Sequence, residues 1–421
     1  MTNINYKSIN FTNLVIALII PFLIWGPFFP DLIVSTSCLF FLFYSFKNDN
    51  FNYLNKKPFI IFLCFCIFSV LISLESEDIS LSIKSSLTYF RIGVFTCFVW
   101  YLIDKDKSIL TFFYYLLILS FSALVIDGYF QYFNGVNLLG FKISGIRVSS
   151  FFGDELIMGS YLSRLFPLLF ALFLIKKKKK FEIYFIGLLF ILVDILIFLS
   201  GERSAFFFLN LSTIFIIIMI KEYQKFRLVT FIIAILCVFI LSLNSSKLSE
   251  RMFESPAKQM GFIESSKEPV IFSEVHHSEI NTAFNMFKHQ PIIGHGPKMF
   301  RVLCKDEKFA YGKYPCSTHP HNFYVQLLAE TGIIGFLFLF SALSYVFFIS
   351  LKQFKSIILK QKRPLTDYQV CLLAGILISV WPISPNGNFF NNWLMIVYSL
   401  PVGFYLQSIY SKTKVKKDLL K

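Results

Sequence analysis

The stretch "FEIYFIGLLFILVDILIFLSGERSAFFFLNLSTIFIIIMI", residues 181–220, contains two apolar runs separated by a short polar turn. Each run, 181–199 and 203–220, is long enough as a helix to cross roughly 30 Å of hydrocarbon. A membrane-spanning segment must satisfy its own backbone hydrogen bonds, so helices are expected here rather than an open sheet. The stretch therefore predicts two consecutive membrane helices, with Arg203 at the start of the second.

The same pattern recurs along the chain. Of its 421 residues, 56% are hydrophobic and only 15% are charged, which excludes a soluble globular protein. The class predicted is an all-α polytopic membrane protein of about twelve transmembrane helices. The predicted spans are 11–26, 30–46, 58–75, 85–103, 109–133, 155–175, 181–199, 203–220, 228–243, 322–350, 366–382 and 390–409.

The placement of basic residues predicts the orientation in the membrane. A net charge of +15 would suggest a nucleic-acid partner in a soluble protein, but here the lysines gather in alternate connections between spans. Cytoplasmic loops of membrane proteins carry such an excess, so both termini are predicted to be cytoplasmic. The "KKKKK" run at 176–180 is then a topological anchor, the bilayer is the partner implied, and no nucleic acid is expected.

Three regions follow from this topology. Residues 1–243 hold the first nine spans, with a short external loop at 134–154. Residues 244–321 form one large external loop, which contains all six histidines. Residues 322–421 hold the last three spans and a basic cytoplasmic tail. The large loop is the extramembrane region big enough to build a site.

Two of the eight cysteines, Cys304 and Cys316, share that large loop. Disulfides persist outside the cytoplasm, so a Cys304–Cys316 bridge is predicted. The other cysteines lie in the spans, where a thiol packs as a small apolar group.

Arg203 is a positive charge on the external side, directly after a Ser-Gly turn. A helix N-terminus with an adjacent arginine combines free N–H groups, the helix dipole and a bidentate donor, so it can bind an anion. The alternative is an arginine that reaches the membrane interface beside Glu202. Both interpretations stay open on the residues alone.

Arg147 in the external loop, and Arg164 and Arg91 inside spans, raise a similar question. An arginine within the membrane costs about 2.5–3.5 kcal/mol on insertion scales, so it needs a partner or a function. The alternative to a function is a structural ion pair with one of the carboxylates Asp154, Glu155 and Asp194.

The stretch "THPHNFYVQLLAETGIIG", residues 318–335, opens the tenth span. Pro320 suits the first turn of a helix, with Ser317 or Thr318 as its cap. A polar stripe follows at i, i+4 and i+8 on one face. Such a stripe at the membrane boundary must face protein or a water-filled cavity. Its members, predicted to line a site, are Asn322, Gln326 and Glu330.

His321 lies at the outer end of the stripe, where an imidazole can take up a proton near neutral pH. The alternative is an inert, solvated loop histidine. His319-Pro-His321 has no carboxylate or cysteine at ligand spacing in the sequence, so neither a metal site nor a cofactor is expected.

External arginines and a candidate base together suggest a lipid-linked diphosphate sugar as substrate. Its lipid would lie among the helices, and its sugar would project outside. Arginines without a metal would hold the departing diphosphate and stabilise its charge. The base would take a proton from an acceptor hydroxyl, and a single displacement would invert the anomeric centre.

Several motifs resemble one family. His321-Asn322, nine residues and then Gly332-Ile-Ile-Gly335 resemble the histidine motif of bacterial O-antigen ligases and the related O-antigen polymerases. "SGERSAFF" is similar to the arginine motif of that superfamily, although Phe207 stands where the ligases often have leucine. "GIRVSSFFGDELIMGSYLSRLFPLL" and "PIIGHGPKMF" are also similar to stretches of this group.

The resemblance implies a metal-independent membrane fold of the GT-C type and a glycan moved from undecaprenyl diphosphate at the periplasmic face of the inner membrane. It implies that His321 is the base and that Arg203 binds the donor diphosphate. Arg251 is expected to bind the diphosphate too, because the family often uses an arginine early in the large loop. Arg147 is expected to do so because it lies in a matching stretch. His319 and Arg164 are expected to line the site.

The acceptor distinguishes two branches: lipid A–core for a ligase, and a second lipid-linked unit for a polymerase. The preserved His-Asn…Gly-x-x-Gly spacing favours the ligase. Twelve spans with intramembrane arginines would also suit a flippase or polysaccharide exporter. The large histidine-bearing loop and the absence of visible half-repeats argue against that transporter.

Overall fold

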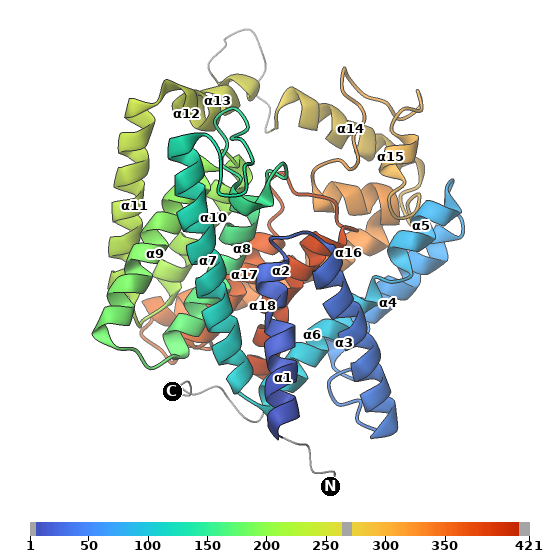
Figure 1. The fold of residues 1–421 in the computed structure, drawn as a ribbon. Helices are drawn as coiled ribbons and strands as arrows, with labels where there is room; N and C mark the ends of the chain where they lie inside the picture. The colour runs from blue at the N-terminus through green and yellow to red at the C-terminus, as the bar shows by residue number, and fades with distance from the viewer. Residues whose placement is uncertain (1–5, 263–271, 412–421) are drawn as a thin grey trace.

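The computed structural model describes residues 6–262 and 272–411 (Figure 1). Within these ranges the secondary structure is helical, apart from isolated β-bridges in the loop at 134–154. The predicted basic cytoplasmic tail lies outside the described residues. The all-α class is therefore confirmed for the part of the chain that is described.

Apolar helices occupy all twelve predicted segments. Of the described helices, eight segments are long and apolar enough to cross a membrane: α3 (Phe28–Lys47), Ile79–Lys105 comprising α5 (Ile79–Ser86) and α6 (Phe90–Lys105), α7 (Ser108–Asn134), α8 (Met158–Ile175), α9 (Lys180–Leu199), α11 (Gln224–Asn244), α16 (Phe323–Ile358) and α18 (Asn392–Tyr410). Four shorter apolar helices fill the remaining segments: Phe11–Phe22 within α1 (Tyr6–Ala17) and α2 (Ile19–Phe22), α4 (Lys57–Ser73), α10 (Arg203–Met219) and α17 (Asp367–Ser379). The chain is an integral membrane protein, and a count of twelve crossings stays a prediction.

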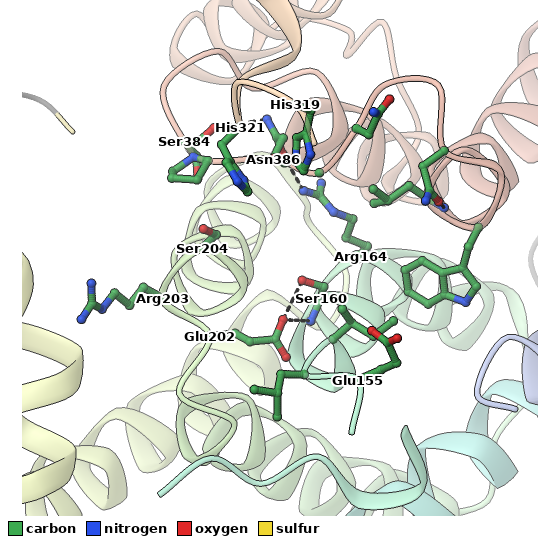
Figure 2. Close-up of a pocket in the computed structure, with 18 of the residues that line it drawn as sticks. Glu155, Ser160, Arg164, Glu202, Arg203, Ser204, His319, His321, Ser384 and Asn386 are labelled. Atoms are coloured by element: carbon green, nitrogen blue, oxygen red, sulfur yellow. Dashed lines mark hydrogen bonds between the residues drawn. The ribbon is translucent and has the colours of Figure 1, made fainter. Parts of the chain in front are cut away.

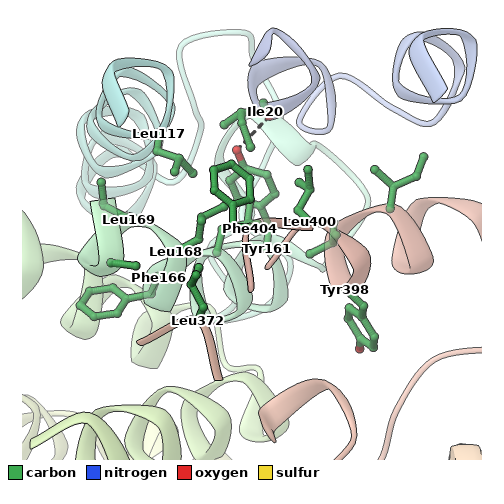
Figure 3. Close-up of a cluster of buried hydrophobic side chains, with 14 of the residues drawn as sticks. Ile20, Leu117, Tyr161, Phe166, Leu168, Leu169, Leu372, Tyr398, Leu400 and Phe404 are labelled. Atoms are coloured by element: carbon green, nitrogen blue, oxygen red, sulfur yellow. Dashed lines mark hydrogen bonds between the residues drawn. The ribbon is translucent and has the colours of Figure 1, made fainter. Parts of the chain in front are cut away.

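Helix α8 forms the centre of the bundle. It packs against α7, α9, α10, α17 and α18, and 94% of it is buried. Tyr161 and Phe166 of α8 meet Leu372 of α17 and Phe404 of α18 in this core (Figure 3). By contrast, only 22% of an 18-residue apolar stretch is buried in α11 and in α16, and both helices expose rows of Ile, Leu and Phe. Such faces suit contact with lipid, whereas α8 is enclosed by protein on nearly all sides.

The ion pairs inside the bundle differ from those predicted. Arg91 forms an ion pair with Asp31, with hydrogen bonds of 2.6 and 2.8 Å. It pairs with neither Asp154 nor Glu155. Asp194 pairs with the fully buried Arg227 at 2.9 Å. The predicted partners for Arg91 and Arg164 are therefore wrong. The acidic and basic residues that meet come from helices whose relative rotation the sequence does not give.

The loop at 134–154 folds back onto the end of α7. The buried carboxylate of Asp127 accepts from the Leu138 N–H at 2.8 Å and from the Ser150 hydroxyl at 2.7 Å. Gln131 accepts from the backbone N–H of Ser149 at 2.9 Å and of Ser150 at 2.8 Å. These bonds fix the loop, which includes the short helix η1 (Ser150–Phe152), and the Val148 N–H donates to the Leu199 carbonyl at the end of α9 at 3.3 Å.

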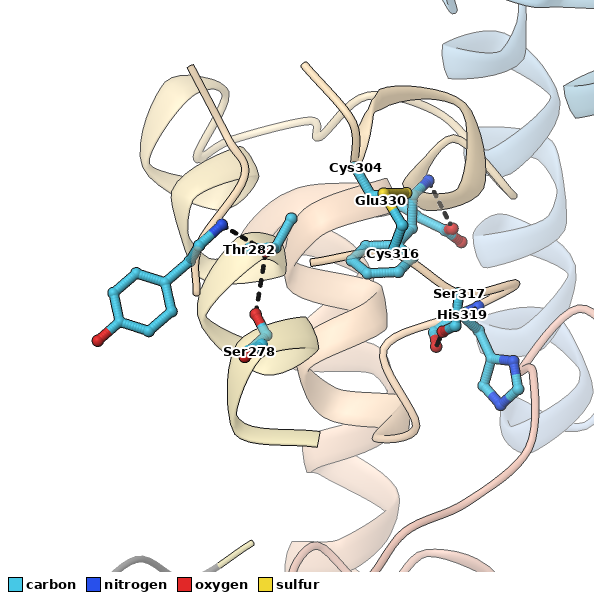
Figure 4. Close-up of a disulfide and its surroundings, with 9 residues drawn as sticks. Ser278, Thr282, Cys304, Cys316, Ser317, His319 and Glu330 are labelled. Carbon is cyan, nitrogen blue, oxygen red and sulfur yellow. Dashed lines mark hydrogen bonds between the residues drawn. A yellow bond between two sulfur atoms is a disulfide. The ribbon is translucent and has the colours of Figure 1, made fainter. Parts of the chain in front are cut away.

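The segment between α11 and α16 forms a group of helices above the bundle in Figure 1: α12 (Ser246–Ser249), η2 (Glu250–Glu254), α13 (Ser255–Gln259), α14 (Glu274–His289) and α15 (Phe300–Leu303). Helix α14 packs against the first turns of α16 through a separate apolar cluster that includes Met286, Phe300 and Ala329. The structure joins Cys304 to Cys316 by a disulfide beside this cluster, with Cα atoms 5.2 Å apart (Figure 4).

Helix α16 is kinked at Gly332, whose φ of 61° and ψ of −162° are not helical. The kink frees backbone groups that the loop 291–296 then satisfies. The Ala329 carbonyl accepts from His295 N–H at 3.1 Å, and the Glu330 carbonyl accepts from Gly296 N–H at 2.8 Å. The "PIIGHGP" loop is thus bonded to the point where the helix bends.

Candidate functional site

A cavity of about 1680 Å³ opens beside the N-terminal ends of α8 and α10. The α11–α16 segment and the loop before α18 complete its wall. Figure 2 shows Glu202 across this cavity from His319 and His321, with Arg164 beside Asn386. The cavity brings together six of the predicted site residues: Arg147, Arg164, Arg203, Arg251, His319 and His321.

Three of these arginines lie around the Ser-Gly turn, and each donates a hydrogen bond to a backbone carbonyl. Arg147 donates from Nε to the Ser200 carbonyl at 3.1 Å, and Arg251 donates from Nε to the Gly201 carbonyl at 3.1 Å. Arg203 donates from Nε to the Arg251 carbonyl at 2.8 Å. Carbonyl partners orient the guanidinium groups without neutralising their charge.

Gly201 permits this close approach. Its φ is +64°, and a Cβ there would lie 2.8 Å from Nε of Arg251 and 2.9 Å from Cγ of Arg147. A side chain at this position would therefore be strained and would push two of the arginines apart. The glycine of the "SGER" turn thus sets the spacing of the basic cluster.

The electrostatics of the cluster favour an anion. Burial lowers the pKa of Arg147; the charge of Glu202 opposes this shift, and the charge of Arg251 adds to it. Within the described residues, Arg147, Arg203 and Arg251 have no carboxylate within 4.0 Å. Like charges gathered without a direct ion-pair partner gain most from a ligand that carries several negative charges.

Glu202 is engaged elsewhere, which bears on the alternative interpretation of Arg203. Its carboxylate accepts from the N–H of Gly159 at 2.6 Å, and from the N–H and hydroxyl of Ser160 at 3.0 and 2.7 Å. It therefore binds the N-terminus of α8 (Figure 2). Burial raises the pKa of Glu202, while these hydrogen bonds oppose the shift. Arg203 does not form an ion pair with Glu202.

Arg164 lies on the cavity wall without a carboxylate partner among the described residues. Its guanidinium lies between the rings of Phe208 and Tyr398, with centroids at 4.3 and 4.0 Å. It donates to the Ile378 carbonyl at 2.7 Å and to Oδ1 of Asn386 at 3.1 Å. Aromatic faces and neutral oxygens thus stabilise a charge that stays available to the cavity.

Asn386 connects Arg164 to the histidine motif. Its backbone N–H donates to the His321 carbonyl at 2.8 Å, and its carbonyl lies 3.2 Å from Nε2 of His319. His321 has a φ of 53°, a left-handed conformation that few non-glycine residues adopt. Strained backbone of this kind persists where the surrounding contacts hold it, and it is frequent at functional sites.

The surroundings of both histidines disfavour the protonated imidazole. Burial lowers the pKa of His319 to about 3, and the neighbouring His321 adds to the shift. Burial and then His276 lower the pKa of His321, against the opposing charge of Glu279. A neutral imidazole has a free lone pair and can accept a proton.

The polar stripe of α16 lies behind the cavity wall rather than on it. Asn322 caps α16 by accepting from the N–H of Tyr324 and Val325, so neither Ser317 nor Thr318 is the cap and Pro320 precedes the first turn. Gln326 donates to Glu330 at 2.9 Å and accepts from Phe389 N–H at 2.9 Å.

Glu330 accepts from Phe300 N–H at 3.1 Å and is fully buried. The stripe thus joins α16 to the chain at 382–389 and at 300. Asn322, Gln326 and Glu330 do not line the cavity in this structure, contrary to the prediction.

The cavity also contains residues that were not predicted from the sequence as part of a site. His276, Lys298 and Arg301 line it, and the carboxylate of Glu279 lies 4.0 Å from Nε2 of His321. The signal for His276 and Glu279 was their i, i+3 spacing on a helix ending before Pro291, which the structure contains as α14. Their proximity to His321 is a tertiary contact that the spacing alone did not reveal.

The fold defines an integral membrane protein, and its cavity gathers several arginines beside His319 and His321. Residues 187–340 match the family model described as O-antigen ligase, which supports the similarity to the O-antigen ligase and polymerase superfamily over α10, α11, α14 and the first half of α16. No curated protein matches the chain. Phe207, the departure from the ligase pattern, lies on the cavity wall with its ring 6.1 Å from that of Trp381.

Proposed function

We propose that the chain is an O-antigen ligase-type glycosyltransferase that moves a glycan from undecaprenyl diphosphate to lipid A–core, without a metal and with inversion. The observation that carries this proposal is the meeting of five arginines and three histidines in one cavity. The reaction would take place at the periplasmic face of the bacterial inner membrane, with both termini in the cytoplasm. The polymerase reaction, with a second lipid-linked unit as acceptor, uses the same donor chemistry.

The arginines supply the donor half of the mechanism. Arg147, Arg203 and Arg251 bind the diphosphate, whose negative charge grows as the bond to the sugar breaks. Their carbonyl partners hold them in place before the substrate arrives, so little reorganisation is needed. Arg164 adds positive charge on the side of the cavity nearest Asn386.

His321 supplies the acceptor half. A nitrogen of its imidazole takes the proton of the acceptor hydroxyl while that oxygen attacks the anomeric carbon. The bond from that carbon to the diphosphate oxygen breaks, and undecaprenyl diphosphate leaves with its electron pair. His319 bonds the Asn386 carbonyl and positions the loop that carries His321.

Purified protein, a lipid-diphosphate glycan and each acceptor in turn provide the test. Release of the lipid diphosphate should fall roughly 10²–10⁴-fold in His321→Ala, the range for loss of a general base. Arg203→Ala should cost about 10- to 100-fold, the equivalent of one charge-assisted hydrogen bond. His277→Ala is the matched control, because His277 lies on α14 but does not line the cavity.

Three results would change the assignment. Unchanged turnover in His321→Ala would refute the assignment of His321 as the base. Product only with a second lipid-linked unit would make the chain a polymerase. Movement of substrate across liposomes without transfer to either acceptor would support a transporter.

A further inference from the structure

Two residues of α14 and one from the loop before α16 bring ligand atoms together at the edge of the cavity. His276 Nδ1 lies 3.1 Å from Oε2 of Glu279, and His321 Nε2 lies 4.0 Å from the same oxygen. All three ligand atoms lie within 4.8 Å of one another. The rings of His276 and His321 are 4.6 Å apart.

The donor set suits a divalent transition metal. Two imidazoles and one carboxylate form a common three-ligand set for Zn²⁺, with the fourth position left open. A tetrahedral site with bonds of about 2.0–2.1 Å separates its ligand atoms by roughly 3.3 Å. The distance from His276 Nδ1 to Oε2 of Glu279 is already this short. Rotation of the partly exposed His276 and His321 side chains can shorten the other distances.

Glu279 gives a second reason to expect a cation. Its carboxylate is 3% exposed, and among the described residues its only basic neighbours within 4.0 Å are the two histidines. A buried carboxylate without a lysine or arginine is costly unless a cation is supplied. The two imidazoles beside it are the commonest protein ligands for a transition metal.

We propose that His276, Glu279 and His321 form a binding site for a divalent transition metal, with Zn²⁺ as the ion that fits the set. The open position faces the cavity, because His276 and His321 both line it. Occupancy would switch transfer off, since the lone pair that binds the metal is then unavailable to accept a proton. The inhibition rests on the proposed function of His321, whereas the binding does not.

Metal binding can be measured without any turnover. Full-length protein, freed of its affinity tag and of metal by a chelator, is titrated with Co²⁺ while its visible absorption is followed. Zn²⁺ is then added to displace the Co²⁺. One equivalent should bind, and His276→Ala and Glu279→Gln should each weaken it by more than about 100-fold, beyond the range for an outer-shell partner.

His277→Ala is the matched control and should bind as the unaltered chain does, because His277 faces Tyr311 rather than the cluster. Size-exclusion profiles show whether each variant is folded. If His276→Ala does not fold, the isosteric Glu279→Gln still tests the site. Unchanged Co²⁺ affinity in both cluster variants would overturn the site.

The transferase assay tests the consequence separately. Saturating Zn²⁺ should lower turnover of the unaltered chain by about 100-fold or more, the contribution of a general base, and the chelator should restore it. Binding that depends on the cluster without inhibition would overturn the switch. Absence of transfer with cluster-dependent binding would refute the proposed function and leave the metal site standing.

Discussion

Gly332 offers a sharp test of how α16 is built. An alanine Cβ at this position would lie 2.2 Å from the Ile292 carbonyl oxygen and 2.7 Å from the Ile293 nitrogen. Both contacts are backbone atoms, which cannot rotate away as a side chain can. The φ of +61° with ψ of −162° also lies in a region that is essentially limited to glycine.

These two effects set the magnitude. Backbone strain of this kind costs about 1–3 kcal/mol. Forcing extra volume into a packed contact costs about 1–3 kcal/mol more. The sum for Gly332→Ala is about 2–6 kcal/mol, a large part of the roughly 5–15 kcal/mol that separates folded from unfolded protein.

Thermal denaturation of purified protein in detergent, followed by size-exclusion chromatography, measures the loss. The control is Gly135→Ala, where φ is +77° but nothing lies within 4 Å of the added carbon. That substitution carries a conformational cost of about 1–2 kcal/mol and no clash. A midpoint for Gly332→Ala equal to that of Gly135→Ala would refute the tight contact between the kink and the loop 291–296.

Gly294→Ala tests the same contact from the other side, since its Cβ would lie 2.5 Å from the Glu330 carbonyl carbon. If both substitutions break one interface, the double variant should lose less stability than the sum of the two. Additive losses would show that the two glycines act independently.

Three further predictions concern stability. Replacing both Cys304 and Cys316 by Ser removes a cross-link over 12 residues and should cost about 3 kcal/mol; an unchanged midpoint under non-reducing conditions would contradict this. Asp194→Asn leaves Arg227 buried without its counter-charge and should lower the free energy of unfolding by about 3–5 kcal/mol. The double variant Asp194→Leu, Arg227→Met should lose less stability. An equal or greater loss in the double variant would contradict the role of this ion pair. Burial lowers the pKa of His295, so the unfolded chain takes up a proton at higher pH than the folded one; stability should fall as pH drops below about 6.5, and less steeply in His295→Gln. Identical pH profiles in the two proteins would contradict that assignment.

The apolar segments could be found from the sequence because crossing a bilayer is a local requirement. A run such as 181–199 must be apolar over its own length, whichever helices surround it. The turn at Gly201 is local in the same sense, since glycine acts on its own backbone. Each of these features is present in the structure close to its predicted position.

The contents of the site were only partly predictable. Arg203 and His321 could be chosen because their motifs are short and continuous. The polar stripe of α16 was misplaced because periodicity shows that Asn322 and Gln326 share a face, but not which neighbour that face meets. The tertiary structure turns that face towards the chain at 382–389 and away from the cavity.

The sequence by itself determined that this is a helical membrane protein, where its helices lie and which motifs resemble a glycan-transferring family. Only the tertiary structure decided which charges meet. Asp194 lies opposite Arg227, and Glu279 lies opposite His321, across separations of tens of residues. The physical reason is that hydropathy is a property of each segment, whereas an ion pair or a ligand set depends on how helices rotate and pack against one another.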